Sequence, residues 1–161
     1  MPASTTANAP VSPIETVDRG PKAIARSTVV DLPASEIFQR LQDPRRHHEL
    51  DGSGTVRDDA SGPTHLAQGD TFTVAMKMFG LPYKITSKVI AFEQDRLIEW
   101  RHPAGHTWRW ELEPLAGNRT RVTETWDFSG NKGVWAYKLL GMPARNAKGI
   151  EATLTCLQHG W

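Results

Sequence analysis

Two histidines and one glutamate are the residues of this sequence best suited to acid–base chemistry. His102 and His106 flank a tight turn in the stretch IEWRHPAGHTWRWELEPL (98–115), which also holds three of the six tryptophans. Their imidazoles could move protons or anchor a ligand at a pocket rim, although the same positions also suit hairpin residues that touch only solvent. Glu124 could anchor a ligand hydroxyl or act as a base with a raised pKa, or it could lie in solvent near a strand end. No nucleophile with a paired base accompanies them, so covalent catalysis is not predicted.

Strand pairing decides which way these side chains face. If residues 103–105 form a three-residue hairpin loop, Trp100 lies opposite Trp108, and the next hairpin places Trp108 opposite Trp126. Both registers put the aromatic rings and Glu124 on an inner face, and opposite charges on the outer face. This predicted outer ladder is solvated and consists of Glu99, Arg109, Glu113 and Arg121. Indole N–H groups and a carboxylate rarely close into a dry core, so the inner face predicts a pocket.

The elements that must position these residues follow from hydrophobic periodicity. A strand is predicted at 23–32, two short helices at 33–50, and strands from about residue 55 to residue 128. A short helix follows Gly130, and a longer one runs from about Pro143 to the C-terminus. Its apolar stripe consists of Ala147, Ile150, Leu154, Leu157 and Trp161. Consecutive strands with short connections predict an α+β fold, in which a long C-terminal helix covers one face of an antiparallel sheet.

Composition excludes several classes of protein. The 161 residues carry a formal charge of +1, and the arginines near the tryptophans fall on the opposite face of the strands, so no nucleic-acid partner is predicted. The single cysteine favours a cytoplasmic location, and no segment is apolar enough for stable membrane insertion. We predict a disordered tail at 1–20 and a single domain at 21–161.

Two motifs resemble binding sites without having the context such sites need. DGSGT (51–55) looks like a glycine-rich nucleotide loop, but it follows a helix and leads into a strand, so a turn is the better interpretation. RRHH (45–48) could hold phosphate or metal, but adjacent histidines on a helix point apart, so a solvated helix face is favoured. Neither a metal nor a cofactor is predicted.

The order of elements and the phrases STVVDLPASEIFQRLQDPRRHHELDGSG, GDTFTVAMKM, YKITSKVIAFEQDRLIEWRHPAGHTWRWELEP and TRVTETWDFS resemble the START/Bet v 1-like (SRPBCC) superfamily. The resemblance covers about residues 23 to 158 and lies nearest the actinobacterial polyketide cyclase/dehydrase branch. It implies a helix-grip fold, which is a curved antiparallel sheet wrapped around the C-terminal helix, with a deep cavity between them. Members of the superfamily bind hydrophobic molecules such as polyketides, lipids, sterols or quinones.

The predicted ligand-binding residues of that cavity come from the sheet and from the helix. They are Met76, Met78, Tyr83, Trp100, His102, Trp108, Trp110, Glu124 and Trp126 on the sheet, with Asn146, Ile150 and Thr153 on the helix; Trp135 and Tyr137 would close one end. The leading hypothesis is a binder of a hydrophobic small molecule of aromatic, polyketide or lipid type. The alternatives are a cyclase or dehydratase in which His102, His106 or Glu124 moves protons, and a protein-interaction module with a vestigial cavity.

Overall fold

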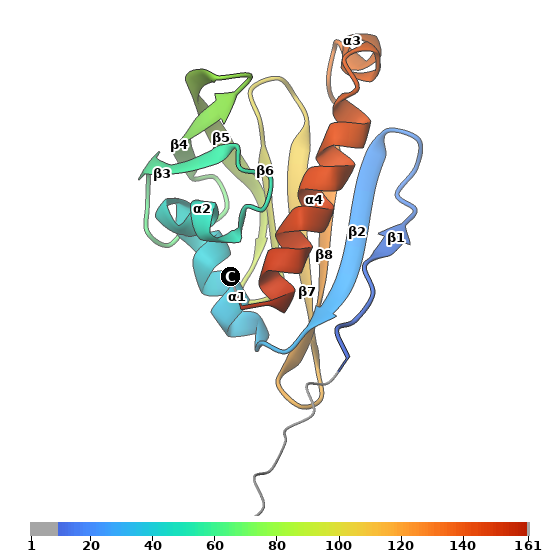
Figure 1. Cartoon of the computed structure of the whole chain (residues 1–161). Coiled ribbons are helices and arrows are strands. Elements are labelled where there is room, and N and C mark those ends of the chain that lie inside the picture. The colour runs from blue at the N-terminus through green and yellow to red at the C-terminus, as the bar shows by residue number, and fades with distance from the viewer. Residues whose placement is uncertain (1–9, 161) are drawn as a thin grey trace, which may run out of the picture.

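The computed structural model describes residues 10–160, and it has one sheet and a set of helices on its concave side (Figure 1). The strands are β1 (Glu15–Val17), β2 (Ala23–Val30), β3 (Val56–Ser61), β4 (Thr71–Met78), β5 (Leu81–Glu93), β6 (Leu97–Arg101), β7 (Thr107–Leu115) and β8 (Arg119–Asp127). The helices are α1 (Ala34–Gln42), the short 3-10 helix η1 (Pro44–Arg46), α2 (His47–Leu50), α3 (Val134–Leu139) and α4 (Met142–Gln158).

The eight strands form one antiparallel sheet in the order β1-β2-β8-β7-β6-β5-β4-β3. Strands β3 to β8 follow one another as hairpins, and β2 pairs with β8, so the first long strand joins the far side of the meander. The sheet curves around α4, which runs across its concave side beside β2 (Figure 1). This arrangement confirms the predicted helix-grip α+β fold.

Both predicted hairpin registers are confirmed. Trp100 pairs with Trp108 across β6 and β7, and Trp108 pairs with Trp126 across β7 and β8. His102 and His106 bracket the tight turn, where the His102 N–H donates to the His106 carbonyl at 2.9 Å. Because side chains alternate along β7 and β8, the indoles face α4, and Arg109, Glu113 and Arg121 face outward.

The core lies between the sheet, α1 and the C-terminal half of α4. Helix α1 begins after Pro33 and ends at Asp43, whose carboxylate accepts from the Arg45 N–H and caps η1. Ile37, Phe38 and Leu41 of α1 are buried on one face. Ile150, Leu154 and Leu157 of the predicted α4 stripe are buried as well. Trp161, the last member of that stripe, lies outside the described residues.

The predicted disordered tail is wrong for residues 15–17. This segment is strand β1, which pairs with β2 and extends the sheet by one edge. Two ion pairs support it: Glu15 lies 3.7 Å from Arg121, and Arg19, just after the strand, lies 3.1 Å from Glu111. A strand of three residues is too short to show alternation in the sequence, and both of its ion-pair partners are more than 90 residues away. Residues 1–9 lie outside the described part of the chain.

Candidate functional site

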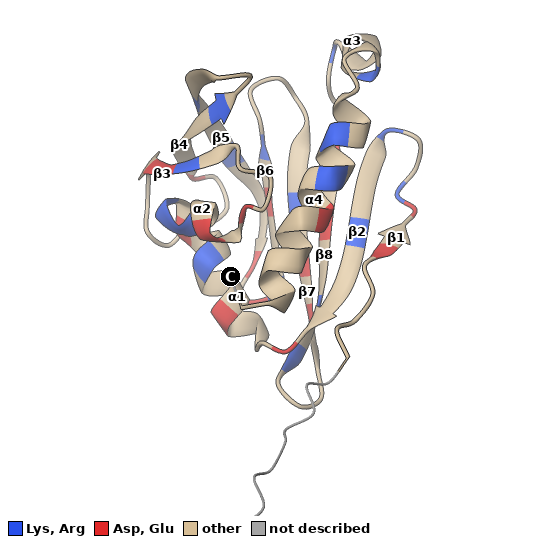
Figure 2. Cartoon of the chain, in the orientation of Figure 1, with Lys and Arg blue, Asp and Glu red and all other residues tan. Residues whose placement is uncertain are grey.

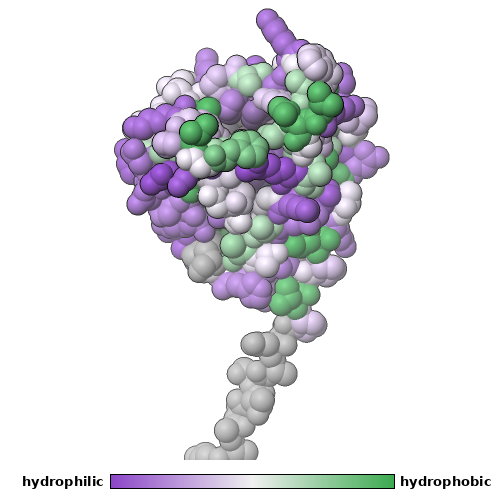
Figure 3. Space-filling view, turned by 45° about the horizontal axis from the view of Figure 1, so that its top comes forward, coloured by the Kyte–Doolittle hydropathy of each residue, from purple (hydrophilic) through white to green (hydrophobic). Residues whose placement is uncertain are grey.

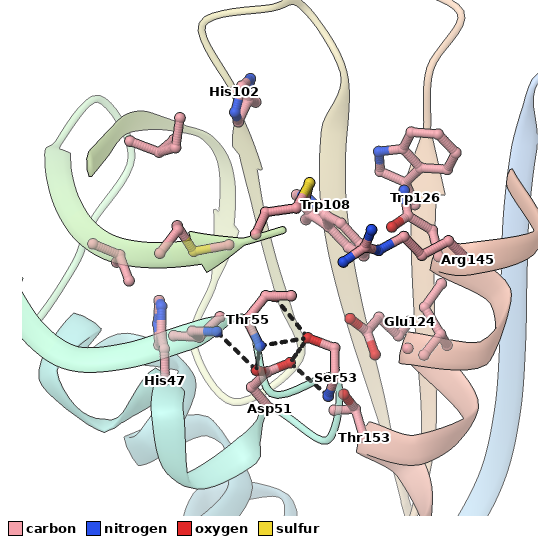
Figure 4. Close-up of a pocket in the computed structure, with 18 of the residues that line it drawn as sticks. His47, Asp51, Ser53, Thr55, His102, Trp108, Glu124, Trp126, Arg145 and Thr153 are labelled. Carbon is pink, nitrogen blue, oxygen red and sulfur yellow. Dashed lines mark hydrogen bonds between the residues drawn. The ribbon is translucent and has the colours of Figure 1, made fainter. Parts of the chain in front are cut away.

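A cavity of about 760 Å³ lies between the inner face of the sheet and α4 (Figure 4). Its walls come from β4 to β8, from α2 and the 51–55 loop, and from α3 and α4. The curved sheet cannot fill this space, because α4 presents small residues to it, including Gly149 and Ala152. A volume of this size is typical of sites for small organic molecules.

The structure brings all the predicted ligand-binding residues to this one cavity. The lining includes Met76, Met78, Tyr83, Trp100, His102, Trp108, Trp110, Glu124 and Trp126 from the sheet, and Asn146, Ile150 and Thr153 from α4. His106 and Tyr137 line it as well, whereas Trp135 is 71% exposed and is not part of the wall. The predicted closure of one end by Trp135 is therefore wrong. A ligand-binding role for the lining residues remains a prediction.

The four inward tryptophans differ in what they can offer a ligand. Trp126 is fully buried and stacks on Phe128 with ring centroids 4.6 Å apart, and Trp110 is only 4% exposed. Trp100 and Trp108 are half-buried and face the cavity. Two indoles thus serve mainly as core, and two provide an open aromatic surface.

Two polar groups of the wall are buried without a partner in the described part of the chain, the Trp126 indole N–H and the Glu124 carboxyl. Glu124 is 6% exposed, and its Oε2 atom has no hydrogen-bond partner among residues 10–160. Burial raises the pKa of this carboxyl well above its usual value of 4.5, and the nearby negative charge of Asp51 raises it further. The side chain points from β8 into the cavity (Figure 4). The raised pKa favours the protonated carboxyl, which can donate a hydrogen bond.

His102 and His106 lie together at the rim. Their rings stack with centroids 4.1 Å apart, and the Ala104 N–H donates to His102 Nδ1 at 3.0 Å. His106 is 9% exposed, and the Tyr137 hydroxyl lies 3.4 Å from its Nδ1 atom. Burial lowers the pKa of both rings, and the neighbouring His102 helps to lower the pKa of His106 to about 3. Both imidazoles are neutral, and His106 is a weak base.

The 51–55 loop is a wall element whose role sequence reasoning missed. The Asp51 carboxylate accepts from the backbone N–H groups of Ser53, Thr55 and Val56, which closes the turn. The Gly52 N–H donates to Thr153 Oγ1 at 3.0 Å and ties the loop to α4. A Cβ atom on Gly52 would lie 2.3 Å from the Ala152 carbonyl carbon, so this glycine permits the close approach. The interpretation of DGSGT as a turn is thus confirmed.

The RRHH segment is only partly a solvated helix face. His47 is 8% exposed, lines the cavity and stacks on Trp100 with centroids 5.0 Å apart. Its Nε2 atom lies 2.8 Å from the Leu41 carbonyl, and burial lowers its pKa to about 4. His48 is exposed, as predicted. Adjacent helical residues point in different directions, which explains the split, but the sequence alone does not say which histidine points inward.

Arg145 is a second wall residue that was not predicted. Its guanidinium carbon lies 4.6 Å from the centroid of the Phe79 ring, and so it bridges α4 and the β4–β5 turn. Figure 4 shows it near Trp108 and above Glu124. The β4–β5 turn and the start of α4 are far apart in sequence. Hydrophobic periodicity, which is a local pattern, therefore cannot predict that Arg145 contacts Phe79.

The sequence of residues 22–158 matches the family described as polyketide cyclase / dehydrase and lipid transport. The chain belongs to this family. Two relatives from Mycobacterium tuberculosis, the uncharacterized proteins Rv0088 and MT0096, are each 49% identical to it over 148 residues. The aligned part covers 89% of this chain and 66% of each relative, so the chain spans just under two thirds of their length.

Solved structures of other family-like proteins share the fold at low identity. Ms6760 of Mycobacterium smegmatis superposes with a TM-score of 0.65 at 16% identity, covering 93% of this chain and 96% of that one. A Rhodobacter sphaeroides protein superposes with a TM-score of 0.69 at 14% identity, covering 91% of this chain and 95% of that one. The polyketide_cyc-like protein Cgl2372 of Corynebacterium glutamicum superposes with a TM-score of 0.60 at 20% identity, covering 88% of this chain and 91% of that one. These likenesses confirm the predicted fold, and the match of residues 22–158 to the family confirms the predicted polyketide cyclase/dehydrase-like branch.

Outside the cavity, this polyketide cyclase/dehydrase family member carries the predicted charge ladder. Arg109 lies 2.8 Å from Glu99, and Arg121 lies 3.9 Å from Glu113. Arg109 also pairs with Glu111 at 3.1 Å. These pairs are partly solvated and stabilise the fold only weakly. Within residues 10–160, no three histidine, cysteine or acidic side chains are grouped so that they could hold a metal ion, and no helix is long and apolar enough to cross a membrane.

Proposed function

We propose that this domain binds a neutral, apolar small molecule with a ring system, held between α4 and the half-buried faces of Trp100 and Trp108. The observation that carries the proposal is the cavity of about 760 Å³, in whose largely apolar wall one buried carboxyl lacks a partner. The family description, polyketide cyclase / dehydrase and lipid transport, supports a hydrophobic ligand. A cytoplasmic location, expected from the single cysteine, belongs to the same proposal.

Glu124 narrows the chemistry of that ligand. A neutral carboxyl donates a hydrogen bond, so the ligand should place a carbonyl, ether or hydroxyl oxygen beside it. A ligand carboxylate at the same depth would bring a second acid into a site whose burial already disfavours charge. The ligand we propose is therefore uncharged where it meets Glu124 and carries at least one oxygen acceptor there.

Binding has more support than catalysis. His106, with its pKa lowered to about 3, is a poor base at neutral pH, and His102 already accepts from the Ala104 N–H. Glu124 could still act as a general acid in a cyclase or dehydratase, and this remains the alternative. An interaction module with a vestigial cavity has less support, because a vestigial cavity would be expected to have filled with side chains.

The direct test combines native mass spectrometry of freshly purified protein with titration by N-phenyl-1-naphthylamine, a neutral fluorescent apolar probe. We expect a copurified apolar ligand, or saturable probe binding that changes tryptophan fluorescence and raises the melting temperature. Glu124→Leu should weaken retention of an oxygen-bearing ligand, while Glu113→Leu, on the outer face, serves as the matched control. The proposal would be refuted if the wild-type protein showed no copurified ligand and no saturable probe binding.

The protonation of Glu124 has its own signature. The folded-state pKa is raised, so between pH 4.5 and that higher value the folded protein binds more protons than the unfolded chain. The free energy of unfolding should therefore fall as pH rises through this window. Glu124→Gln, which stays neutral and keeps a donor, should lose this fall in urea titrations across pH. If the wild type and Glu124→Gln share the same pH dependence, the carboxyl is not held neutral.

A further inference from the structure

Most of the exposed large hydrophobic side chains gather in two segments. Five of the six among residues 10–160 belong to the β4–β5 turn and to α3 with the residue that follows it. They are Phe79 (81% exposed), Leu81 (70%), Trp135 (71%), Leu139 (80%) and Leu140 (73%). We call these five residues the apolar rim. Single exposed hydrophobic residues are ordinary, but a cluster drawn from two elements indicates a contact surface.

Two residues of the apolar rim lie at an opening of the cavity. Phe79 and Leu140 line the cavity while remaining mostly exposed, so the cavity reaches the surface between them. Arg145 packs on Phe79, which ties the β4–β5 turn to the start of α4. The turn and α3 lie at the same end of the molecule in Figure 1, and Figure 3 shows hydrophobic side chains on that end.

The two segments that carry the apolar rim are basic and contain no acid. Residues 71–92 hold Lys77, Lys84 and Lys88, and residues 128–150 hold Lys132, Lys138, Arg145 and Lys148, without any Asp or Glu in either segment. Lys84 of β5 pairs at 3.3 Å with Asp59 of β3, which lies on the other side of β4. The formal charge of the whole chain is only +1, so this end is more cationic than the rest. Figure 2 shows lysine and arginine on α3 and on the adjoining part of α4.

We propose that the apolar rim docks this domain on the surface of an anionic lipid bilayer. Tryptophan and leucine side chains enter the interface between headgroups and acyl chains, and the surrounding lysines contact the anionic headgroups. Docking buries the cavity opening against the membrane, so an apolar molecule can pass between the two without crossing water. The attachment is peripheral and requires no membrane-spanning segment.

A second copy of the chain fits this surface less well. Two copies meeting through the apolar rim would bring together two sets of like charges without an acid in either segment to offset them. An acidic protein would match the charge, but the hydrophobic side chains protrude separately from a turn and a short helix, which suits a deformable interface better than a flat protein surface. The experiment below distinguishes both a second copy and an acidic protein from a lipid bilayer.

The test is co-sedimentation of the full chain with vesicles of phosphatidylcholine alone or with about a third phosphatidylglycerol, at low salt and without any cavity ligand. We expect binding to the anionic vesicles only. The double variant Trp135→Gln with Leu139→Gln should bind at least about tenfold more weakly. The double variant Lys132→Gln with Lys138→Gln should lose roughly 25-fold, since each cation near an anionic surface contributes about fivefold.

The chain offers matched controls for both variants. Val11 is the sixth exposed large hydrophobic residue (59%), and it adjoins Ser12, whose carbonyl accepts from Gln158 at the opposite end of α4. Arg119 begins β8 next to the β7–β8 turn, which is at the other end of the molecule (Figure 1). Val11→Gln and Arg119→Gln should bind vesicles like the wild type. Circular dichroism checks that each variant is folded.

The remaining outcomes overturn the proposal. Absence of wild-type binding to anionic vesicles excludes docking, and equal binding by the Trp135 and Leu139 double variant excludes the apolar rim as the contact. A wild-type dimer that this double variant dissociates, without vesicle binding, assigns the surface to a second copy. Binding of an acidic protein without vesicle binding assigns it to a protein partner. None of these results bears on the cavity, because the assay contains no cavity ligand.

Discussion

The buried imidazole of His47 makes the free energy of unfolding depend on pH. Its pKa is lowered from 6.5 to about 4, so on acidification the unfolded chain takes up a proton before the folded protein does. The stability that His47 contributes is complete above pH 6.5 and is lost as pH falls from there toward 4. One pKa unit corresponds to about 1.4 kcal/mol, so the full loss is about 3 kcal/mol, of which about 2 kcal/mol falls between about pH 7.5 and about pH 5.

The assay is urea unfolding of the wild type and of His47→Gln at a series of pH values. Glutamine does not titrate, and it keeps an N–H donor for the Leu41 carbonyl, which His47 Nε2 approaches to 2.8 Å. Loss of the stack on Trp100 should lower stability at every pH, so the change with pH is the informative quantity. It should be smaller by about 2 kcal/mol in His47→Gln between about pH 7.5 and about pH 5.

Exposed His48, next on the same helix, provides the matched control. His48→Gln should keep the acid sensitivity of the wild type. A residual acid loss in His47→Gln is expected from His106, whose pKa is lowered to about 3 in the same direction. If His47→Gln and His48→Gln lose equal stability on acidification, His47 is not a buried neutral imidazole, and its place in the cavity wall is wrong.

Five further substitutions, in three tests, probe the core, the cavity wall and the outer face. Arg109→Gln, in the charge ladder, should lower the free energy of unfolding by no more than about 1 kcal/mol and leave binding of N-phenyl-1-naphthylamine unchanged; weakened binding at equal stability would place Arg109 in a site. Trp126→Ala should cost about 3–5 kcal/mol in urea unfolding, whereas half-buried Trp108→Ala should cost less and mainly weaken probe affinity; the reverse ranking would contradict the assignment of core and wall. Gly52→Ala should destabilise the fold by about 1–3 kcal/mol because of its contact with Ala152, whereas Gly133→Ala, whose Cβ would meet only Asn131 Oδ1 at 3.5 Å, should be tolerated.

Much of the sheet could be predicted because its information is local. Strand alternation and two tight turns fix the Trp100–Trp108–Trp126 row and the opposite charge ladder, and a single register explains both faces. The same parity placed Glu124 inward, where it is now seen without a partner for Oε2. Helix α4 was predictable from its stripe, because Ile150, Leu154 and Leu157 recur at helical spacing.

The parts that could not be predicted depend on contacts between distant segments. The ion pairs that support strand β1 join Glu15 to Arg121 and Arg19 to Glu111, and Gly52 is needed only because α4 passes against its loop. His47 and His48 are equivalent in sequence, and the position of Trp100 in the folded sheet decides which of them is buried. The exposure of Trp135 likewise depends on how α3 projects from the end of α4, for which periodicity carries no signal.

Burial has the same chemical consequence for each titratable group in the cavity wall whose pKa is shifted. It lowers the pKa of His47, His102 and His106, and it raises the pKa of Tyr83 and Glu124. Both directions favour the uncharged form, because a charged form loses more hydration energy on burial. Burial therefore favours the neutral form of all five wall groups, while cations gather on the segments around the opening. A wall of this kind favours a neutral ligand, and a cationic rim favours delivery from an anionic surface. The two proposals can be tested independently, because Lys132 and Lys138 do not line the cavity.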